Sequence, residues 1–409
     1  LTIDGQRQTN LGLKQLAFLC REAPFVSVAS CRRFSRAGGR MPPIRKKGTR
    51  PAMDDQARND LMTLLSIPGQ PGEELAVAVH LSRELVALGV PTTCISSDKA
   101  HEQSEYGGNT GNLIVRLDGH GRGPRRLFSA HMDTVPGAVG AVPRLDAVNS
   151  RVVNDASGKA LGGDNRTGCA VLMQVARSLC ARERDHAPAT LIFFVQEEVG
   201  LVGARGMDVA QLGETKPAMC FNFDGSQATE CVTSVIGTKR FTIDVDGIAA
   251  HAGANPGDGV SAAIIAADAL AELNRDGWHG VVEKTSGRGS ANAGIVQGGT
   301  GSNVVMPELH ILAEARSHDA VFRDQIIAAW KTAFERSVDA HVNHATERGA
   351  VRFGPGPTYE AFALSDDTPV VQAVLAVASQ CGIAVECVSN DAGMDANWIV
   401  GHGIPAVTI

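Results

Sequence analysis

Four short segments of the chain place metal-binding side chains at the end of an apolar run or after a glycine pair. Their imidazole nitrogen and carboxylate oxygen atoms are donors that Zn²⁺ accepts in proteins. Several carboxylates in one crevice would repel each other, and a pair of divalent cations about 3.5–4 Å apart relieves that repulsion. The pattern therefore predicts a metal site. The candidate residues are His131 with Asp133, Asp164, Glu197 with Glu198, and Asp224.

Two of these segments supply a pair of side chains, and the spacing suggests different roles within each pair. Asp133 follows His131 by two residues and could orient its ring by a hydrogen bond on the side away from the metal. Glu197 and Glu198 are adjacent, so in an extended chain their side chains point in opposite directions. One of them can bind metal while the other acts as general base for a water whose pKa falls to about 7 on zinc.

Each segment taken alone also has an ordinary structural interpretation. A His-x-Asp sequence usually lies on the surface, and paired glutamates are usually solvated. An aspartate after a strand most often caps a turn or a helix. The prediction depends on the repetition of these elements at strand ends within one region of the chain.

The elements that must position these residues are buried strands alternating with amphipathic helices, which is typical of an α/β domain. In open α/β sheets, sites form beyond the carboxyl ends of the strands. We therefore expect a mixed, mostly parallel sheet flanked by helices, formed by residues 53–236 and 352–409. The expected strands are 112–116, 127–130, 191–195, 219–223, 383–388 and 405–409, and the expected helices are 55–65, 73–88, 167–181, 369–380 and 396–400.

The pattern changes between residues 237 and 351. Residues 239–245 alternate apolar and polar side chains like a half-exposed strand. The order strand, helix, strand, strand, helix predicts a small α+β domain inserted in the larger one. Its further elements are the helices 260–274 and 320–341 and the strands 293–296 and 308–315.

The composition is that of an ordinary globular protein, with 409 residues, 44% of them hydrophobic and 20% charged. No apolar run reaches the roughly 18 residues of a membrane-spanning helix. The nine cysteines are odd in number and form no CxxC motif, which favours a reducing compartment and a cytoplasmic location. Gly119 and Gly121 form a lone glycine pair without the pattern of a dinucleotide-binding helix.

Residues 1–52 differ from the rest because they hold eleven Lys and Arg against two Asp and Glu. Such a basic arm could be a targeting or nucleic-acid-binding segment, a disordered tail, or upstream sequence that is not native protein. Met41 and Met53 are plausible starts. We favour disorder or a start-site artefact, and we expect no nucleic acid among the partners.

The motifs around the candidate residues resemble the di-zinc exopeptidase family, which includes peptidase T, carboxypeptidases and acetylornithine deacetylase. The resemblance covers about residues 53–409, and its motifs occur in family order. Two regions of the inserted domain are most similar to the peptidase T-like branch. The motifs are 128–136, 161–168, 195–204 and 223–225, and the branch-specific segments are 250–256, 298–303 and 314–319.

The resemblance implies a role for each candidate residue. His131 and Asp224 would bind one zinc ion, Asp164 would bridge two, and Glu198 would bind the second. Glu197 would be the general base, and Asp133 would support His131. The cofactor implied is a pair of Zn²⁺ ions.

The inserted domain would be the family's ferredoxin-like lid and dimerisation domain. Within it, His251 would help to stabilise the oxyanion, reaching the site of a partner subunit, while Asn303 and Arg316 would bind substrate. Arg grips carboxylates through two parallel hydrogen bonds. His251 could instead be simply exposed in its Gly/Ala/Pro loop, and Arg316 could be a surface strand residue.

The family supplies one more zinc-binding histidine after its last strand, whereas this sequence ends in the expected strand 405–409. His402 precedes that strand, so we expect it at the opposite edge of the sheet. On this basis the second zinc site is under-ligated in this chain, which is either part of an active enzyme or an impaired one.

Three functions remain open from the sequence. The first is a zinc-dependent exopeptidase of the tripeptidase or aminopeptidase type, in which a two-metal-activated water and a Glu base hydrolyse small peptides. The second is an N-acyl amino-acid amidohydrolase, which uses the same amide chemistry. The third is a catalytically impaired protein that binds metal or peptide. We expect a homodimer that acts on a small peptide and has no membrane partner.

Overall fold

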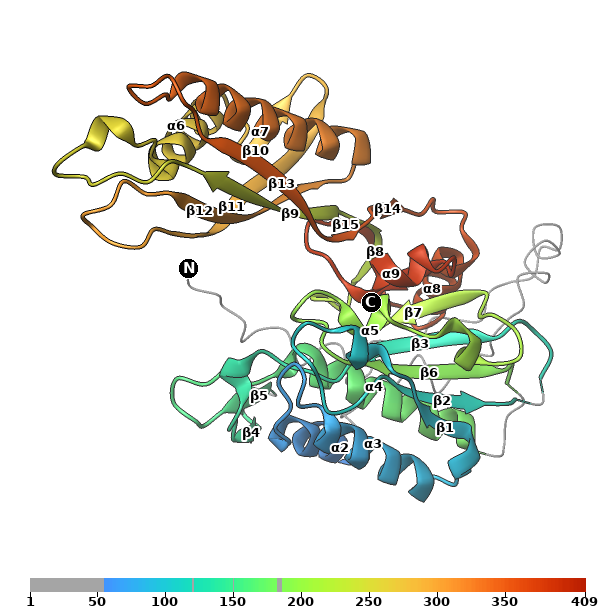
Figure 1. The fold of residues 1–409 in the computed structure, drawn as a ribbon. Coiled ribbons are helices and arrows are strands. Elements are labelled where there is room, and N and C mark those ends of the chain that lie inside the picture. Colours follow the sequence, from blue (N-terminus) through green and yellow to red (C-terminus); the bar gives the residue numbers. More distant parts are fainter. Residues whose placement is uncertain (1–54, 120, 150, 182–185) are drawn as a thin grey trace. The chain divides into compact units, whose positions relative to one another are not determined.

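The computed structural model describes residues 55–119, 121–149, 151–181 and 186–409 (Figure 1). The basic arm 1–52 lies outside these residues. The chain forms two compact units. The first unit contains the described residues up to Thr233 together with Leu364–Ser389 and Met394–Ile409, and the second contains Ser234–Ala363 and Asn390–Gly393.

The first unit is built on a mixed sheet in the order β1-β2-β6-β3-β7-β16-β8, with β15 also paired to β8. The four central strands β6, β3, β7 and β16 are parallel, whereas β1 runs antiparallel to β2, β2 to β6, and β8 to β16. This confirms the predicted fold class. The strands are β1 (Ile95–Ser97), β2 (Leu113–Leu117), β3 (Arg126–His131), β6 (Ala189–Phe194), β7 (Met219–Asn222), β8 (Glu230–Val235), β15 (Glu386–Asn390) and β16 (Ala406–Thr408).

Alternate residues of the central strands share one hydrophobic core with helices α2, α3, α4 and α8 (Figure 1). Leu61 in α2, Leu81 in α3 and Leu172 in α4 are almost completely buried in it. Each such side chain stabilises the fold by about 1.5–3 kcal/mol. The helices are α2 (Asp55–Ser66), α3 (Leu75–Ala87), α4 (Gly163–Cys180), α5 (Val202–Arg205), α8 (Pro369–Gln380) and α9 (Asp395–Gly401).

Shorter elements connect these layers. A two-stranded hairpin, β4 (Pro143–Asp146) and β5 (Arg151–Asn154), precedes α4. The single-turn 3₁₀ helices are η2 (Thr92–Cys94), η3 (Ala100–Gln103), η4 (Pro136–Ala138), η5 (Val209–Leu212) and, in the second unit, η6 (Pro256–Asp258).

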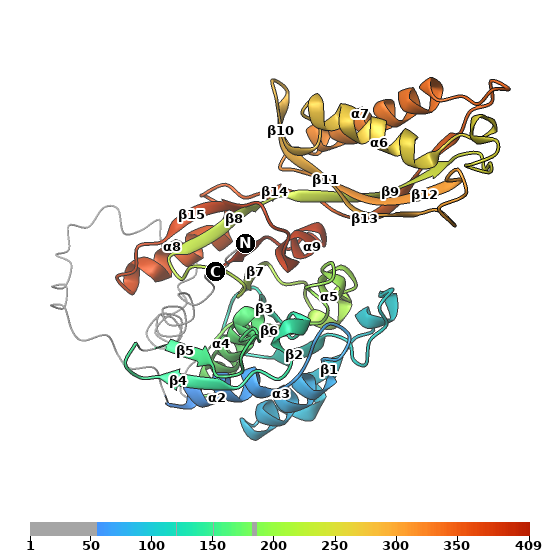
Figure 2. The same ribbon diagram turned by 90° about the vertical axis from the view of Figure 1, so that its left-hand side faces the viewer.

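The second unit is an antiparallel sheet in the order β10-β11-β12-β9-β13, with α6 and α7 on one face (Figure 2). Phe241 of β9 meets Trp330 of α7 edge to face, with ring centroids 5.7 Å apart. Asp319 caps α7 by accepting from the amides of Val321 and Phe322. The elements are β9 (Gly237–Asp246), α6 (Ala262–Arg275), β10 (Gly280–Lys284), β11 (Gly287–Gly298), β12 (Glu308–Ser317), α7 (Ala320–Ala340), β13 (Ala350–Tyr359) and β14 (Phe362–Ala363).

Three strands of the second unit were not expected from the sequence, namely β10, β13 and the two-residue strand β14, which pairs with β8. β10 forms a hairpin with β11, and β13 pairs with β9, so this sheet continues past the expected end at residue 351. The segment Gly354-Pro355-Gly356-Pro357 within β13 has the composition of a loop. The pairing with β9 is irregular between Pro355 and Thr358, which accommodates a proline that cannot donate to the ladder.

The described residues were also searched for membrane-spanning helices. Among them, no helix is both long enough and apolar enough to cross a bilayer.

Candidate metal centre

Three neighbouring parallel strands carry the candidate residues to the same edge of the first unit's sheet. β3 ends at His131, β6 leads into Glu197 and Glu198, and β7 leads into Asp224. The amide of Met132 donates to the carbonyl of Phe194 over 2.7 Å, so the ends of β3 and β6 are in register. Parallel strands place their carboxyl ends together, which is why sequence position alone could indicate this edge.

His131, Asp164 and Asp224 form a compact group in which one ligand atom from each residue lies within 4.8 Å of the others. The Nε2 atom of His131 is 3.0 Å from Oδ1 of Asp164 and 3.5 Å from Oδ1 of Asp224. His131 is buried, Asp224 is mostly buried, and the side chain of Asp164 is 73% exposed. The group is therefore open to solvent on the side of Asp164.

Asp164 reaches this group because the start of α4 is tied to the end of β7. Gly162, with a φ of 76°, turns the chain into the helix, and the Asp164–Asn165 peptide bond is cis. The side-chain amide of Asn165 donates to the carbonyl of Phe223 over 2.8 Å. Gly168 allows this approach, since a Cβ atom there would lie 2.2 Å from the same carbonyl oxygen.

The charges of the group fit a bound cation. Burial disfavours the charged form of His131, yet Asp224, Asp133 and Asp164 together raise the pKa of its ring well above the ordinary histidine value. The negative charges of these acids thus favour a positive charge near Nε2 of His131. A divalent metal ion carries two positive charges, whereas a proton carries one. His131, Asp164 and Asp224 supply one imidazole nitrogen and two carboxylates, a donor set that suits Zn²⁺.

A further buried acid supports this fit, and sequence reasoning missed it. Asp395, the first residue of α9, is completely buried, and neither of its carboxylate oxygens has a hydrogen-bond partner among the described residues. Burial raises the pKa of Asp395 well above its ordinary value, and the charges of Asp224 and Asp133 add to the effect. An isolated buried carboxylate is costly unless a positive charge lies nearby. Its only sequence signal was its position shortly after β15.

Glu197 and Glu198 lie beside the group without belonging to it. Their amides donate to Oδ1 and Oδ2 of Asp133 over 3.0 and 3.1 Å. Burial raises the pKa of Glu197 well above its ordinary value, with further contributions from Asp224 and Asp395. Burial and the charge of Asp164 raise the pKa of Glu198 to about 7. Both glutamates thus have raised pKa values, as is common for acids at functional sites.

The remaining candidate residues belong to the second unit. His251 and Asn303 lie in adjacent loops, where the amide of Ala252 donates to the carbonyl of Asn303 over 2.9 Å. Arg316, in β12, donates to Glu314 over 2.8 Å. His402, in the first unit, is outside the metal group, and its Nε2 atom lies 3.0 Å from the carbonyl of Ala204.

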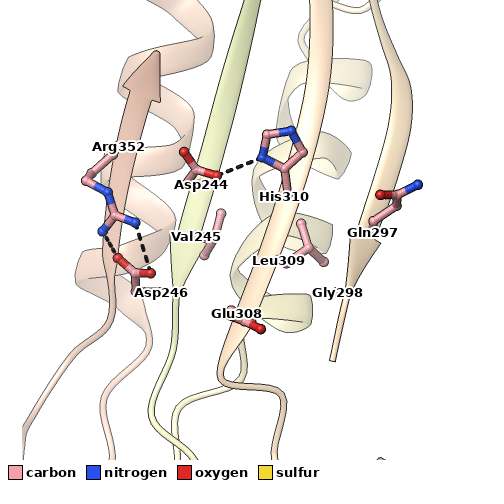
Figure 3. A pocket seen from close by; sticks show the side chains of 9 residues that line it. All are labelled: Asp244, Val245, Asp246, Gln297, Gly298, Glu308, Leu309, His310 and Arg352. Carbon is pink, nitrogen blue, oxygen red and sulfur yellow. Dashed lines mark hydrogen bonds and ion pairs between the residues drawn. The ribbon is translucent and has the colours of Figure 1, made fainter. Parts of the chain in front are cut away.

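A hollow on the sheet of the second unit offers a different cluster of charged residues (Figure 3). There His310 pairs with Asp244 over 2.7 Å, and Arg352 pairs with Asp246 through both terminal nitrogens. Its charges are therefore largely paired with one another. Among the described residues, the only group of three or more potential ligands close enough to hold a metal ion is that of His131, Asp164 and Asp224.

Comparisons with known proteins agree with this geometry. Residues 112–254 match peptidase family M28, and residues 233–342 match the peptidase dimerisation domain. The uncharacterized protein YqjE of Bacillus subtilis is 29% identical over 350 residues, which cover 86% of this chain and 88% of that protein. One of the polypeptides of the p-aminobenzoyl-glutamate hydrolase of Escherichia coli is 28% identical over 301 residues, which cover 68% of this chain and 65% of that polypeptide.

Solved structures show the same fold. Aminopeptidase PepT from Bacillus cereus superposes with a TM-score of 0.72 at 28% identity, covering 87% of this chain and 89% of that chain. A tripeptidase from Staphylococcus aureus superposes with a TM-score of 0.73 at 25% identity, over the same shares of the two chains. With its two matched peptidase domains and its buried imidazole–carboxylate group, the chain resembles the di-zinc exopeptidases and is a metallopeptidase.

Proposed function

We propose that the chain is a two-zinc exopeptidase of short peptides, of the tripeptidase or aminopeptidase type. The observation that carries this proposal is the group of His131, Asp164 and Asp224, whose ligand atoms lie within 4.8 Å of one another. His131 and Asp224 would hold one ion, Glu198 would hold a second, and Asp164, at the start of α4, would be a ligand of both. When bound, the two ions supply Lewis-acid activation of water and of the scissile carbonyl.

Glu197 is the general base in this proposal. Burial raises the pKa of its carboxyl group, which strengthens it as an acceptor for a proton of the attacking water. The new carbon–oxygen bond forms as water adds to the carbonyl carbon. The proton on Glu197 then passes to the amide nitrogen, the carbon–nitrogen bond breaks, and the amine leaves. Asp133 keeps Glu197 in place through its backbone amide.

Three residues of the second unit are proposed to bind substrate. The Nδ1 atom of His251 accepts from the amides of Gly253 and Ala254 over 3.2 and 3.1 Å. Since an amide can only donate, the neutral ring carries its hydrogen on Nε2, which can donate to a developing oxyanion. Arg316 binds a substrate carboxylate, and Asn303 binds the substrate backbone.

A homodimer and a cytoplasmic location complete the proposal. The match of residues 233–342 to a peptidase dimerisation domain supports the dimer. Light scattering of the purified protein tests it, and a monomer at micromolar concentration would contradict it. The location rests on the cysteine pattern and is tested by cell fractionation.

An N-acyl amino-acid amidohydrolase is the second candidate. The similarity to the p-aminobenzoyl-glutamate hydrolase polypeptide favours it, because that protein's name describes cleavage of an amide bond to an amino acid. The chemistry of the metal group is the same for both reactions. The difference lies in the part of the substrate that the rest of the site recognises.

A substrate panel separates these candidates. The zinc-loaded protein is assayed with tripeptides, dipeptides, N-acetyl amino acids and p-aminobenzoyl-glutamate, with a Glu197→Gln variant as the blank. We expect a kcat/KM for tripeptides at least about 10-fold higher than for the acyl amino acids, a difference of about 1.4 kcal/mol in transition-state binding. The reverse order would identify an amidohydrolase. Zinc binding without turnover of any substrate would identify a binding protein.

A further inference from the structure

The segment that carries Glu197 and Glu198 is held by side chains from distant parts of the chain. Four consecutive backbone amides, those of residues 195–198, each donate to a side-chain oxygen. The acceptors are Asn112 Oδ1 for Val195 (3.1 Å), Glu74 Oε1 for Gln196 (3.0 Å), and Asp133 Oδ1 and Oδ2 for Glu197 (3.0 Å) and Glu198 (3.1 Å). We call Glu74, Asn112 and Asp133 the amide cradle.

The members of the amide cradle are completely buried and are themselves held in place. The same Oε1 atom of Glu74 accepts from the amide of Gly72 over 2.9 Å. The side-chain nitrogen of Asn112 donates to Asp98 over 2.7 Å and to the carbonyl of Gly203 over 2.9 Å. Buried polar groups with several good partners have few alternative positions. The cradle is therefore a rigid template for residues 195–198.

Gln196 is the residue whose backbone most needs this template. Its φ is 55°, in the left-handed region that favours glycine. A non-glycine residue stays there only where its surroundings fix it. The amide of Gln196 is bound by Glu74, and its side chain accepts from Ser104 over 2.5 Å and donates to the carbonyl of Gly107 over 2.7 Å. This turn at Gln196 determines the directions in which the next two side chains leave the backbone.

A buried cation interacts electrostatically with the acids of the amide cradle. Arg166 is 1% exposed, and its guanidinium donates to the carbonyls of Ile67 and Gly69 over 3.2 and 3.3 Å. The charges of Asp133 and Glu74 act on it favourably. Burial and the charge of Asp133 raise the pKa of Glu74 to about 7. Its Oε1 atom can accept from the amides of Gly72 and Gln196 whether the acid is neutral or ionised.

We propose that Glu74 is a positioning residue of the hydrolytic site. It fixes the turn at Gln196 and thereby orients Glu197 for proton transfer and Glu198 for metal binding. This inference rests on the proposed function for those two residues. Glu74 is not part of the metal group. Its effect on the two glutamates would pass through the backbone amide of Gln196.

The test compares two substitutions of Glu74 with a matched control. Glu74→Gln keeps an oxygen acceptor for the amide of Gln196, whereas Glu74→Met removes it at similar volume. The control is Asp60→Leu, because Asp60 is also a buried acid of the first unit, 8% exposed, and accepts from Gln174 and Arg177 in α4. Each variant is measured for kcat, KM and Tm, and for Co²⁺ binding followed by the visible absorption of the bound ion.

We expect Glu74→Met to lower kcat at least about 10-fold while KM changes by less than about 3-fold, since small displacements of a catalytic group cost rate. Its affinity for the second equivalent of Co²⁺ falls at least about 10-fold, as is typical when a partner behind a metal ligand is lost. Glu74→Gln stays within about 3-fold of the unmodified protein on both measures. Asp60→Leu lowers Tm but keeps both kcat and Co²⁺ affinity.

Three outcomes would overturn the inference. They are wild-type kcat and Co²⁺ affinity in Glu74→Met, equal impairment in Glu74→Gln and Glu74→Met, and a loss of kcat in Asp60→Leu that matches its loss of Tm. If the unmodified protein hydrolyses no amide, the proposed function fails. The Co²⁺ titration still decides the role of Glu74 in that case.

Discussion

The Nδ1 atom of His131 lies 3.0 Å from the backbone carbonyl oxygen of Asp133 and 3.3 Å from Oδ1 of the same residue. A carbonyl oxygen only accepts, so Nδ1 carries a hydrogen and Nε2 is the nitrogen that faces Asp164 and Asp224. Asp133 thus sets the ring orientation of His131 and, through its carboxylate, holds the amides of Glu197 and Glu198. One residue connects the imidazole donor with the two glutamates.

Removal of metal should destabilise the first unit. Without a cation, the carboxylates around His131 are left in a buried, crowded environment. A ligand present at 100 times its Kd stabilises the folded state by about 2.7 kcal/mol. We therefore expect a chelator to lower Tm and added Zn²⁺ to restore it, as measured by scanning calorimetry. The His131→Ala variant should show no such zinc-dependent shift, and an unchanged Tm on chelation would contradict the metal site.

Substitution of the proposed base should separate chemistry from metal binding. Glu197→Gln removes the proton acceptor but keeps the backbone amide that donates to Asp133. We expect kcat for a tripeptide to fall by about 10²–10⁴-fold, the usual contribution of general base catalysis. Zinc content, measured by atomic absorption, should stay at the wild-type value. Hydrolysis within a few-fold of wild type would show that another residue is the base.

The packing of α4 against the end of β7 should tolerate no side chain at Gly168. A Cβ atom there would lie 2.2 Å from the carbonyl oxygen of Phe223 and 2.9 Å from the Cβ of Ala130. We expect Gly168→Ala to lower the free energy of unfolding by about 1–3 kcal/mol, as overpacking usually does. Urea unfolding measures this change. Gly137→Ala is the control, because a Cβ atom at Gly137 has no neighbour within 4 Å, and an equal loss in both variants would refute the steric explanation.

Arg316 should matter most for substrates with a free carboxylate. Its removal in Arg316→Met takes away a charged hydrogen-bond partner worth about 1.5–3 kcal/mol. We expect KM for a tripeptide to rise by about 10–100-fold, since each 1.4 kcal/mol is a factor of ten. The same tripeptide with an amidated C-terminus is the control and should be hardly affected by the substitution. Equal effects on both peptides would place Arg316 away from the carboxylate.

The buried thiol of Cys220 predicts a loss of stability at high pH. Burial raises the pKa of Cys220 from 9.0 to about 12 in the folded protein. Above pH 9 the unfolded chain has released this proton while the folded protein keeps it, so stability falls as pH rises. Between pH 8 and pH 10, the free energy of unfolding should fall by about 1.4 kcal/mol more in the wild type than in Cys220→Ala. Urea unfolding measures it, with Cys94→Ala as control, and parallel pH dependence in wild type and Cys220→Ala would contradict the burial effect.

Strand-end positions made much of the metal group predictable. His131 and Asp224 follow apolar runs that could only be buried strands, and the rule of parallel sheets brings such ends together. Asn112 could not be found this way, because β2 is antiparallel to β6 and its beginning, not its end, lies beside this edge. The local sequence of a strand does not show whether the strand runs parallel or antiparallel to its neighbours. Glu74 lies within the expected helix 73–88, and only the structure shows that it binds the backbone at Gln196.

The tie between α4 and β7 has a consequence for the order of events during synthesis. His131, Asp164 and Asp224 come from segments separated along the chain. They cannot coordinate an ion jointly until β3 and β7 have paired, α4 has packed against β3, and Asn165 has bound the carbonyl of Phe223. A nascent chain that ends before residue 224 lacks Asp224, one of the three donor residues. Zinc binding thus indicates that the centre of the sheet is complete. Ribosome-bound nascent chains that end before this point should bind no zinc from the surrounding buffer.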